Sequence, residues 1–145
     1  MPRIHFIVPI DPFGKARPRF SSAGGHAVAY TPKKTREEER LVRFHARQAM
    51  GKRYPFARGV PLSVEIVANF PIPKSYTKKR HFDCVNKDEL PTKKVDIDNI
   101  CKGVLDAMNE AVFWDDAQVV KLVAKKQYVE GAGSIEVTCT TLVDD

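Results

Sequence analysis

Hydrophobic and polar residues alternate along several short stretches of the chain, as they do in strands that bury one face. The clearest alternation covers residues 62–70, and two prolines follow it. A β-branched, apolar run predicts another strand over residues 4–8. We expect two more strands at about 118–128 and 134–142, joined by a turn rich in glycine.

Apolar residues spaced three and four apart predict a long helix over residues 33–50. Thr35 and Glu38 have the spacing of a capping box near its start, and Gly51 is typical of the residue that ends a helix. The polar side of this helix is basic because it carries four arginines, Arg36, Arg40, Arg43 and Arg47.

A second, shorter helix is expected over residues 99–108. Asp98 or Asn99 can cap its start, and Asn109 suits the left-handed conformation that ends many helices. Its buried stripe consists of Ile100, Val104, Ala107 and Met108.

Two long stretches show neither the alternation of a strand nor the three-and-four spacing of a helix. Residues 9–31 are rich in proline, glycine and serine and predict a loop or a loose hairpin, whereas residues 74–94 are polar and basic and predict a second loop. The order strand, helix, strand, helix, strand, strand indicates an α/β (α+β) fold. We expect a single domain over residues 1–145, with a mixed sheet of about four strands and two main helices.

The balance of charge is basic. Lys and Arg number 24 against 18 Asp and Glu, which gives a net charge of +6 and an isoelectric point near 9.3. This excess is compatible with an anionic partner such as nucleic acid. The hydrophobic fraction of 43% is enough to build a core, which excludes a wholly disordered chain.

The cysteines and the apolar stretches bear on where the protein works. Cys84, Cys101 and Cys139 are isolated, which favours reduced thiols over a disulfide framework or a structural zinc site. No stretch reaches the roughly 20 apolar residues of a membrane span, and the first residues lack a secretory signal pattern. We therefore expect a soluble, cytoplasmic protein that does not enter a membrane.

Basic residues in the first long loop stand between Phe13 and Phe20. This mixture suits phosphate contacts and stacking on unpaired bases, but a solvated loop anchored by two phenylalanines has the same composition. The candidates for DNA contact in the two long loops are Lys15, Arg17, Arg19, Lys78, Lys79 and Arg80. Further candidates for phosphate contact are Lys74 and three arginines of the first helix, Arg36, Arg40 and Arg43.

Acidic residues gather between positions 96 and 116, against the basic trend of the chain. Asp96 and Asp98 lie two apart at the end of an expected extended segment, so both side chains would point to one face. Two close carboxylates repel each other, and a divalent cation removes that penalty. With Asp116 brought back by the fold, such a group suits Mg²⁺ and phosphodiester hydrolysis by an oriented water. Helix caps and solvated turns also produce this spacing, so the pattern alone leaves both interpretations open.

Lys102 follows Asp98 by four residues and would share its side of a helix, and Asp106 continues the same strip. One interpretation is an ordinary ladder of surface ion pairs, each worth a few tenths of a kcal/mol. The other places a cation beside the metal site, in contact with the scissile phosphate or the leaving oxygen. The spacing does not separate the two.

A compound motif runs through this region, from residue 95 to about residue 128. It consists of Val95-Asp96-Ile97-Asp98-Asn99-x-x-Lys102-x-x-x-Asp106-Ala107, followed by Phe113-Trp114-Asp115-Asp116-Ala117-Gln118-Val119-Val120. It closely resembles the RusA family of Holliday junction resolvases. Members of that family are small, dimeric, Mg²⁺-dependent endonucleases that cut four-way DNA junctions symmetrically.

The resemblance implies a RusA-like fold and a homodimer that resolves branched DNA in recombination and repair. It also implies that Asp96, Asp98 and Asp116 are catalytic carboxylates and Mg²⁺ ligands, and that Lys102 is the catalytic lysine. Mn²⁺ would be a substitute metal, and we expect no small-molecule cofactor beyond the metal.

Asp106 and Asp115 would support these residues, and Asp115 would orient its neighbour or cap the turn. The chain departs from the family pattern in its loop over residues 74–94, which is longer than in compact members. Two other functions also fit the residues. One is a non-catalytic DNA-binding module, and the other is a metal nuclease that acts on flaps, single strands or other branched DNA.

Whether the aspartates meet depends on where the second helix ends. A helix over residues 99–108 is roughly 15 Å long, and residues 110–116 reach about 23 Å when extended, so Asp116 can return to Asp98 within one chain. If the helix continues to residue 112, the remaining residues reach at most about 14 Å. A partner chain would then supply Asp116 across a two-fold axis. We favour the intrachain site.

Overall fold

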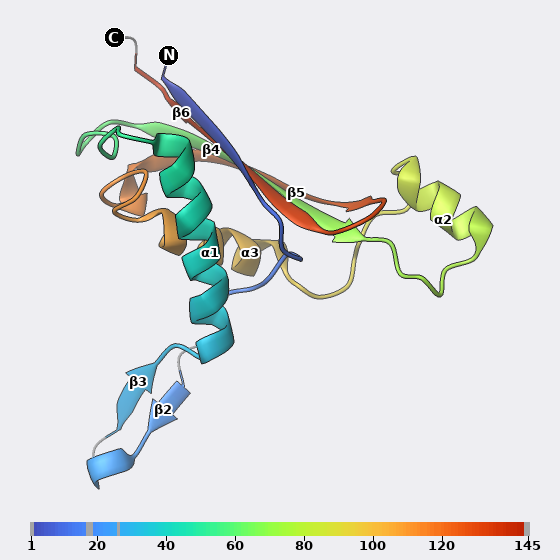
Figure 1. Ribbon diagram of the computed structural model, residues 1–145, viewed down its shortest axis with the longest axis horizontal. Coiled ribbons are helices and arrows are strands. Elements are labelled where there is room, and N and C mark those ends of the chain that lie inside the picture. Colours follow the sequence, from blue (N-terminus) through green and yellow to red (C-terminus); the bar gives the residue numbers. More distant parts are fainter. Residues whose placement is uncertain (1, 17–18, 26, 144–145) are drawn as a thin grey trace.

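A mixed four-stranded sheet forms the centre of the computed structural model, which describes residues 2–16, 19–25 and 27–143 (Figure 1). The strands lie in the order β1, β6, β4, β5. β5 runs parallel to β4, whereas the other neighbours are antiparallel. The bounds are Arg3–Val8 for β1, Leu62–Pro71 for β4, Val119–Val129 for β5 and Ser134–Thr141 for β6.

Two main helices, α1 (Lys33–Met50) and α3 (Ile97–Met108), pack against each other and against the sheet. α1 contacts β1, and α3 contacts β5. Buried residues alternate with more exposed ones along β1 and β6, so helices cover one face of the sheet and solvent meets the other. The result is a two-layer α+β fold, which confirms the predicted fold class.

The helix-covered face is buried across three strands and open at the fourth. Ile4, Cys139 and Val64 stand side by side on β1, β6 and β4, and all three are buried. Leu122 continues this row on β5 but is 44% exposed. The two helices therefore bury the row as far as β4 and leave its end on β5 accessible.

The first predicted helix is confirmed over residues 33–50, and Gly51 follows it with a φ of 60°. Its predicted capping box is wrong. Pro32 is the N-cap residue, and no side chain caps this end. Thr35 already lies inside the first turn, where its side chain is buried in the domain.

The second predicted helix is confirmed as α3, with all four residues of its expected stripe buried. However, it begins at Ile97, and its N-cap residue is Asp96, which makes no side-chain capping hydrogen bond. The predicted caps Asp98 and Asn99 are therefore wrong, because both already lie in the first turn of the helix.

The predicted loop over residues 74–94 contains a helix, α2 (Lys78–Val85), which corrects the prediction. Thr77 caps α2 by accepting a hydrogen bond from the amide of Arg80 at 3.2 Å. Its residues are mostly polar and Cys84 is its buried one, so no apolar period marks the helix in the sequence. Neither α2 nor any other helix in the described residues is long and apolar enough to cross a membrane.

The first long loop contains a small hairpin, in agreement with the hairpin alternative. β2 (Arg19–Ser21) pairs with β3 (Val28–Tyr30), and the short 3-10 helix η1 (Ala23–Gly25) lies between them. The hairpin extends beyond the N-terminal end of α1, whereas α2 projects from the far end of the sheet (Figure 1). Both projections lie outside the two-layer body.

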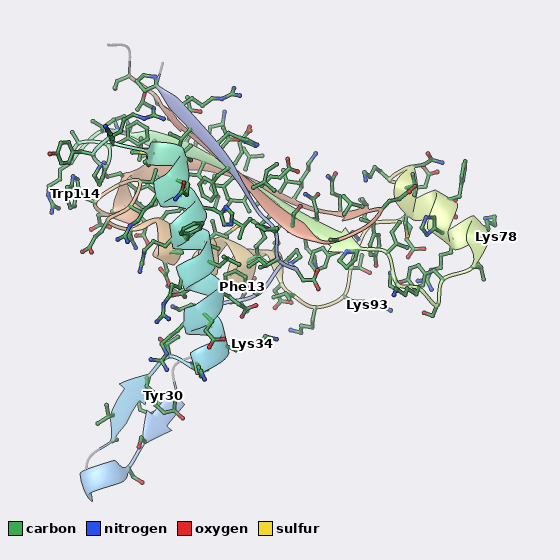
Figure 2. The ribbon with its side chains drawn as sticks, viewed as in Figure 1. Phe13, Tyr30, Lys34, Lys78, Lys93 and Trp114 are labelled. Carbon is green, nitrogen blue, oxygen red and sulfur yellow. The ribbon has the colours of Figure 1, made fainter. Side chains whose placement is uncertain are left out.

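The segment that follows β1 crosses α3 at Gly103. Phe13, labelled in Figure 2, is buried there, and a Cβ atom at Gly103 would lie 2.9 Å from Cε2 of its ring. The amide of Lys15 donates a hydrogen bond to the carbonyl of Asn99 at 3.1 Å. The close approach at Gly103 therefore sets where Lys15 emerges beside α3.

Replacing Gly103 with alanine should destabilise the protein. Gly→Ala inside a helix ordinarily stabilises by about 1 kcal/mol, but overpacking a core costs about 1–3 kcal/mol. We expect Gly103→Ala to lower the free energy of unfolding in urea by about 1–2 kcal/mol, because its Cβ meets the buried ring of Phe13. The loss should be smaller in a Phe13→Leu background. A Gly103→Ala protein more stable than the wild type would contradict this packing.

Candidate active site

An open cleft of about 540 Å³ lies between α3 and β5. Its floor includes Leu122 and Ala124, whose row neighbours on β4 are buried. The cleft thus occupies the part of the sheet that the helices leave uncovered. Four charged residues line this space, which we call the aspartate cleft: Asp98, Lys102, Asp106 and Asp116.

Asp98 lies in the first turn of α3. The unpaired backbone N–H groups and the dipole at this end of a helix favour a negative charge. Lys102 and Asp106 follow at intervals of four residues, which places all three on one strip of α3. The strip forms the helical wall of the aspartate cleft.

Asp96 does not line the aspartate cleft. Its carboxylate pairs with Lys94 at 3.3 Å, in an exposed position at the N-cap of α3. The predicted extended segment through Asp98 is wrong, because the helix begins at Ile97 and each helical residue turns the direction by about 100°. Strand alternation therefore does not bring the two aspartates to one face.

The chain reverses direction sharply between α3 and Asp116. α3 ends at Met108, and the left-handed residue is Glu110, with a φ of 68°. The prediction of Asn109 at this place is wrong, since its φ is −57°. The amide of Glu110 donates to the carbonyl of Phe113 at 2.6 Å and closes the turn. The return is short enough for Asp116 to line the same cleft as the start of α3 within one chain.

Asn109 contacts Asp116 through its side chain. Its Nδ2 atom donates to Oδ2 of Asp116 at 3.4 Å. Its Oδ1 atom is buried and has no hydrogen-bond partner within the described part of the chain, which is unusual for a buried acceptor. In the sequence, Asn109 is marked only as the end of a helix, and its side-chain contact with Asp116 was not predicted. The sequence offered one signal for this contact, which is a side-chain amide at the turn that leads to Asp115 and Asp116.

Asp115 caps the short 3-10 helix η2 (Asp116–Gln118). Its Oδ1 atom accepts a hydrogen bond from the amide of Ala117 at 2.9 Å, and Gln118 accepts one from the amide of Asp115 at 3.2 Å. Gln118 also donates to the carbonyl of Ala57 at 2.8 Å, which fastens the turn to the body. The carboxylate of Asp115 is thus engaged in the cap, and Asp116 is the member of the pair that lines the cleft.

Asp106 forms ion pairs with two lysines. Its Oδ2 atom lies 3.5 Å from Nζ of Lys102 and 3.4 Å from Nζ of Lys15. Lys15 also forms a short salt bridge with Glu39 of α1. This Lys15 network, formed by Lys15, Glu39 and Asp106, joins the N-terminal segment, α1 and α3 at the edge of the aspartate cleft.

The pKa of Lys15 reflects this network. Burial lowers the pKa of its ammonium group, but the hydrogen bond and charge of Glu39, with the charge of Asp106, outweigh burial and raise it above 10.5. Lys15 is therefore positively charged at neutral pH and turned toward carboxylates inside the protein.

Cys101 also lines the cleft, and its thiol is buried. Burial and the nearby Asp98 carboxylate raise the pKa of this thiol, so it stays protonated near neutral pH. The remaining polar groups that line the cleft are the three carboxylates and the ammonium of Lys102.

The residues of the cleft fit a metal that needs few protein ligands. Within the described residues, no three His, Cys, Asp or Glu side chains gather closely enough to enclose an ion. Asp98 and Asp116 nevertheless share one open space, and the side-chain amide of Asn109 donates a hydrogen bond to Asp116. Mg²⁺ binds through one or two carboxylates and keeps several waters or phosphate oxygens. The arrangement suits Mg²⁺ rather than a closed, four-ligand structural site.

The predicted DNA-contact residues of α2 fall into two groups. Arg80 is engaged within the protein, because its Nε atom donates to Glu89 at 2.9 Å and its guanidinium lies 3.6 Å from the centre of the Tyr76 ring. Lys78 and Lys79 are exposed, and Figure 2 shows Lys78 at the outer end of α2. Lys78 is therefore available to an external partner, and so is Lys79, because its pair with Asp83 at 3.7 Å is exposed and weak.

Of the DNA contacts predicted in the first loop, the structure describes only some of the side chains. Arg17 and the side chain of Arg19 lie outside the described part of the chain. Lys15 belongs to the Lys15 network rather than to an open loop. Phe13 is buried as an anchor, and Phe20 is 73% exposed on the hairpin.

Removing Lys15 should destabilise the protein. Lys15→Met leaves Glu39 and Asp106 partly buried without their shared cation, and we expect the free energy of unfolding to fall by about 1–3 kcal/mol in urea. Because the folded pKa lies above 10.5, this stabilisation is fully present below that pH and is lost as the pH rises through the raised pKa.

Lys33→Met is the matched control, since Lys33 makes an exposed pair with Glu37 at 4.0 Å. Its effect should stay within about 0.5 kcal/mol. Equal losses in the two variants would show that the Lys15 network does not stabilise the fold.

Comparison with known proteins gives a family for the chain. The chain is 35% identical over 129 residues to the Bacillus subtilis (strain 168) protein named "Uncharacterized protein YqaN", and the match covers 88% of this chain and 89% of that protein. Residues 9–140 match the family described as "Endodeoxyribonuclease RusA". A match over nearly the whole chain shows that this protein belongs to the RusA family of endodeoxyribonucleases.

Proposed function

We propose that the protein is a Mg²⁺-dependent endonuclease that resolves four-way DNA junctions by paired, symmetric nicks, in recombination and repair. The single observation that carries the proposal is the aspartate cleft, in which Asp98, Asp116 and Lys102 of one chain line the same open space. Membership in a family of endodeoxyribonucleases supports the choice of DNA as the substrate.

Each charged residue of the cleft has a part in this proposal. Asp98 and Asp116 hold Mg²⁺, with Mn²⁺ as a substitute. The bound ion would neutralise charge on the phosphate and orient an attacking water. Lys102, whose side chain is 64% exposed, contacts the scissile phosphate and stabilises the charge that develops there. Asn109 keeps the Asp116 carboxylate oriented toward the cleft.

Asp96 and Asp106 act at the margins of the site. Asp96 stands directly before Ile97, which lines the cleft, and serves as an additional ligand once it gives up its exposed pair with Lys94. Such an exposed pair is weak and easily exchanged. Asp106 positions Lys102 through the ion pair between them. The carboxylate of Asp106 is itself held by the ammonium of Lys15.

Paired nicks on opposed strands call for two identical sites, which a two-fold homodimer supplies. The outer edge of β5 supports this assembly, because β5 ends the sheet and Val120 and Val123 are exposed along it. Unpaired strand edges of this kind are surfaces on which a second chain can pair. The same strand forms the floor of the aspartate cleft, so pairing there would hold two clefts in a defined relation.

Asp98→Asn should abolish cleavage and retain DNA binding. Loss of this carboxylate removes a proposed ligand of the metal, and we expect the nicking rate on a four-way junction to fall by about 100-fold or more. Asp88→Asn is the matched control, because Asp88 is exposed after α2 and away from the cleft. Undiminished cutting by Asp98→Asn would overturn the assignment.

The substrate is tested by comparing a four-way junction, a flap and a linear duplex, each with and without Mg²⁺. The proposal expects Mg²⁺-dependent, paired nicks on the junction. Preference for the flap would favour a nuclease for other branched DNA. Binding without nicking on any substrate would favour a non-catalytic DNA-binding module.

Mixed dimers test whether each site belongs to one chain. In a dimer of one Asp98→Asn chain and one Asp116→Asn chain, every intrachain site carries one defect, so cleavage should not recover. The reason is that both aspartates line the cleft from the same chain. If sites were shared across the dimer, one site would be intact. Recovered nicking in this mixture would therefore contradict the intrachain site.

A further inference from the structure

A second hollow, of about 200 Å³, opens on the side of α1 that faces the C-terminal end of α3. Its walls are built from one stretch of the α1 polar side. We call it the arginine hollow, and its lining residues are Arg36, Glu39, Arg40 and Arg43.

Arg43 connects the arginine hollow to the aspartate cleft. Its Nε atom donates to the carbonyl of Ala107 at 3.0 Å, and its Nη2 atom donates to the carbonyl of Asp106 at 3.3 Å. These carbonyls lie in the last turn of α3, where cationic donors are favourable. Because Asp106 also lines the aspartate cleft, its hydrogen bond with Arg43 links a residue of the cleft to a residue of the hollow.

The charge of the arginine hollow is not balanced within the described residues. Glu39 is its acidic member, and Glu39 is already paired with Lys15. Arg36 and Arg40 are exposed, and neither guanidinium makes a hydrogen bond or ion pair with any described residue. Glu37, which neighbours Arg40 on α1, pairs with Lys33. Two guanidiniums therefore face the solvent at the arginine hollow.

Guanidinium groups recognise phosphate oxygens in a planar, two-pronged geometry, and they are less strongly hydrated than ammonium groups. Arg36 and Arg40 are four residues apart, so they lie on the same side of α1, about one turn from each other. Two such groups can converge on one phosphate. The shape and charge of the hollow thus match a phosphodiester rather than an apolar or cationic ligand.

We infer that Arg36 and Arg40 bind a non-scissile phosphate of the DNA whose scissile phosphate lies in the aspartate cleft. Glu39 lines the hollow, Asp106 lines the cleft, and Lys15 pairs with both, so the two spaces lie near each other, as positions along one DNA backbone require. Arg43, although it lines the hollow, is a positioning residue that fixes α1 to α3. This inference rests on the proposed function, since it needs DNA in the cleft.

The test measures junction binding in the Asp98→Asn background, which prevents cutting. Affinity for a four-way junction is measured against salt concentration for that protein and for the same protein with R36Q/R40Q. Loss of one phosphate contact should reduce the slope of log affinity against log salt by about 0.9. We expect the affinity at about 0.1 M salt to fall roughly 10-fold.

The matched control is R3Q/K52Q, which also removes two exposed positive charges but lies away from both spaces. Its affinity should fall by less than about 2-fold, with a nearly unchanged slope. The urea midpoint of R36Q/R40Q should equal that of the parent, because neither side chain has a hydrogen bond or ion pair with any residue that the structure describes. By contrast, Arg43→Gln should lower the midpoint, since it removes two hydrogen bonds to α3.

The outcomes separate this inference from the proposed function. If the wild type nicks junctions but R36Q/R40Q binds them with an unchanged slope, the inference fails and the proposed function stands. If no variant nicks DNA but R36Q/R40Q still loses affinity and slope, the phosphate site stands and the proposed function fails. Equal losses in R36Q/R40Q and R3Q/K52Q would also overturn the inference, because they would indicate general charge rather than a site.

Discussion

The aspartate cleft exists because two helices cover only part of one face of the four-stranded sheet. The buried rows run across β1, β6 and β4 and emerge on β5, where Leu122 is 44% exposed although its neighbour Val64 is fully buried. α3 therefore has two roles. One side completes the core with Ile100 and Val104, and the strip that carries Asp98 forms a wall of the cleft. Core packing of α3 thus positions the chemistry of the site.

Charge pairing separates the basic residues by role. Lys15 and Arg43 use their charge inside the protein, the first on Glu39 and Asp106 and the second on carbonyls of α3. These contacts hold the N-terminal segment, α1 and α3 together beside the cleft. The exposed guanidiniums and lysines remain for an anionic partner. Which basic side chains are already paired inside the protein therefore says more about DNA contact than the net charge of +6 does.

Much of the fold was predictable because its signals are local. The alternation over residues 62–70, the long helix over residues 33–50 and the buried stripe of α3 depend only on the spacing of apolar residues along the chain. α2 was missed because its residues are mostly polar and its cap, Thr77, is a weak signal alone. The direction of Asp96 was missed because it depends on whether the helix starts before or after Ile97.

The sequence by itself determined the class of the fold, the compound motif and the aspartates worth examining, since these depend on residue identity and spacing. Only the tertiary structure decided that Asp98 and Asp116 share a cleft while Asp96 pairs with Lys94. It likewise decided that Asn109 contacts Asp116 and that Arg43 is engaged with α3. The physical reason is that a side chain's partners come from segments distant in the chain, and packing brings them together without leaving a periodic mark in the sequence.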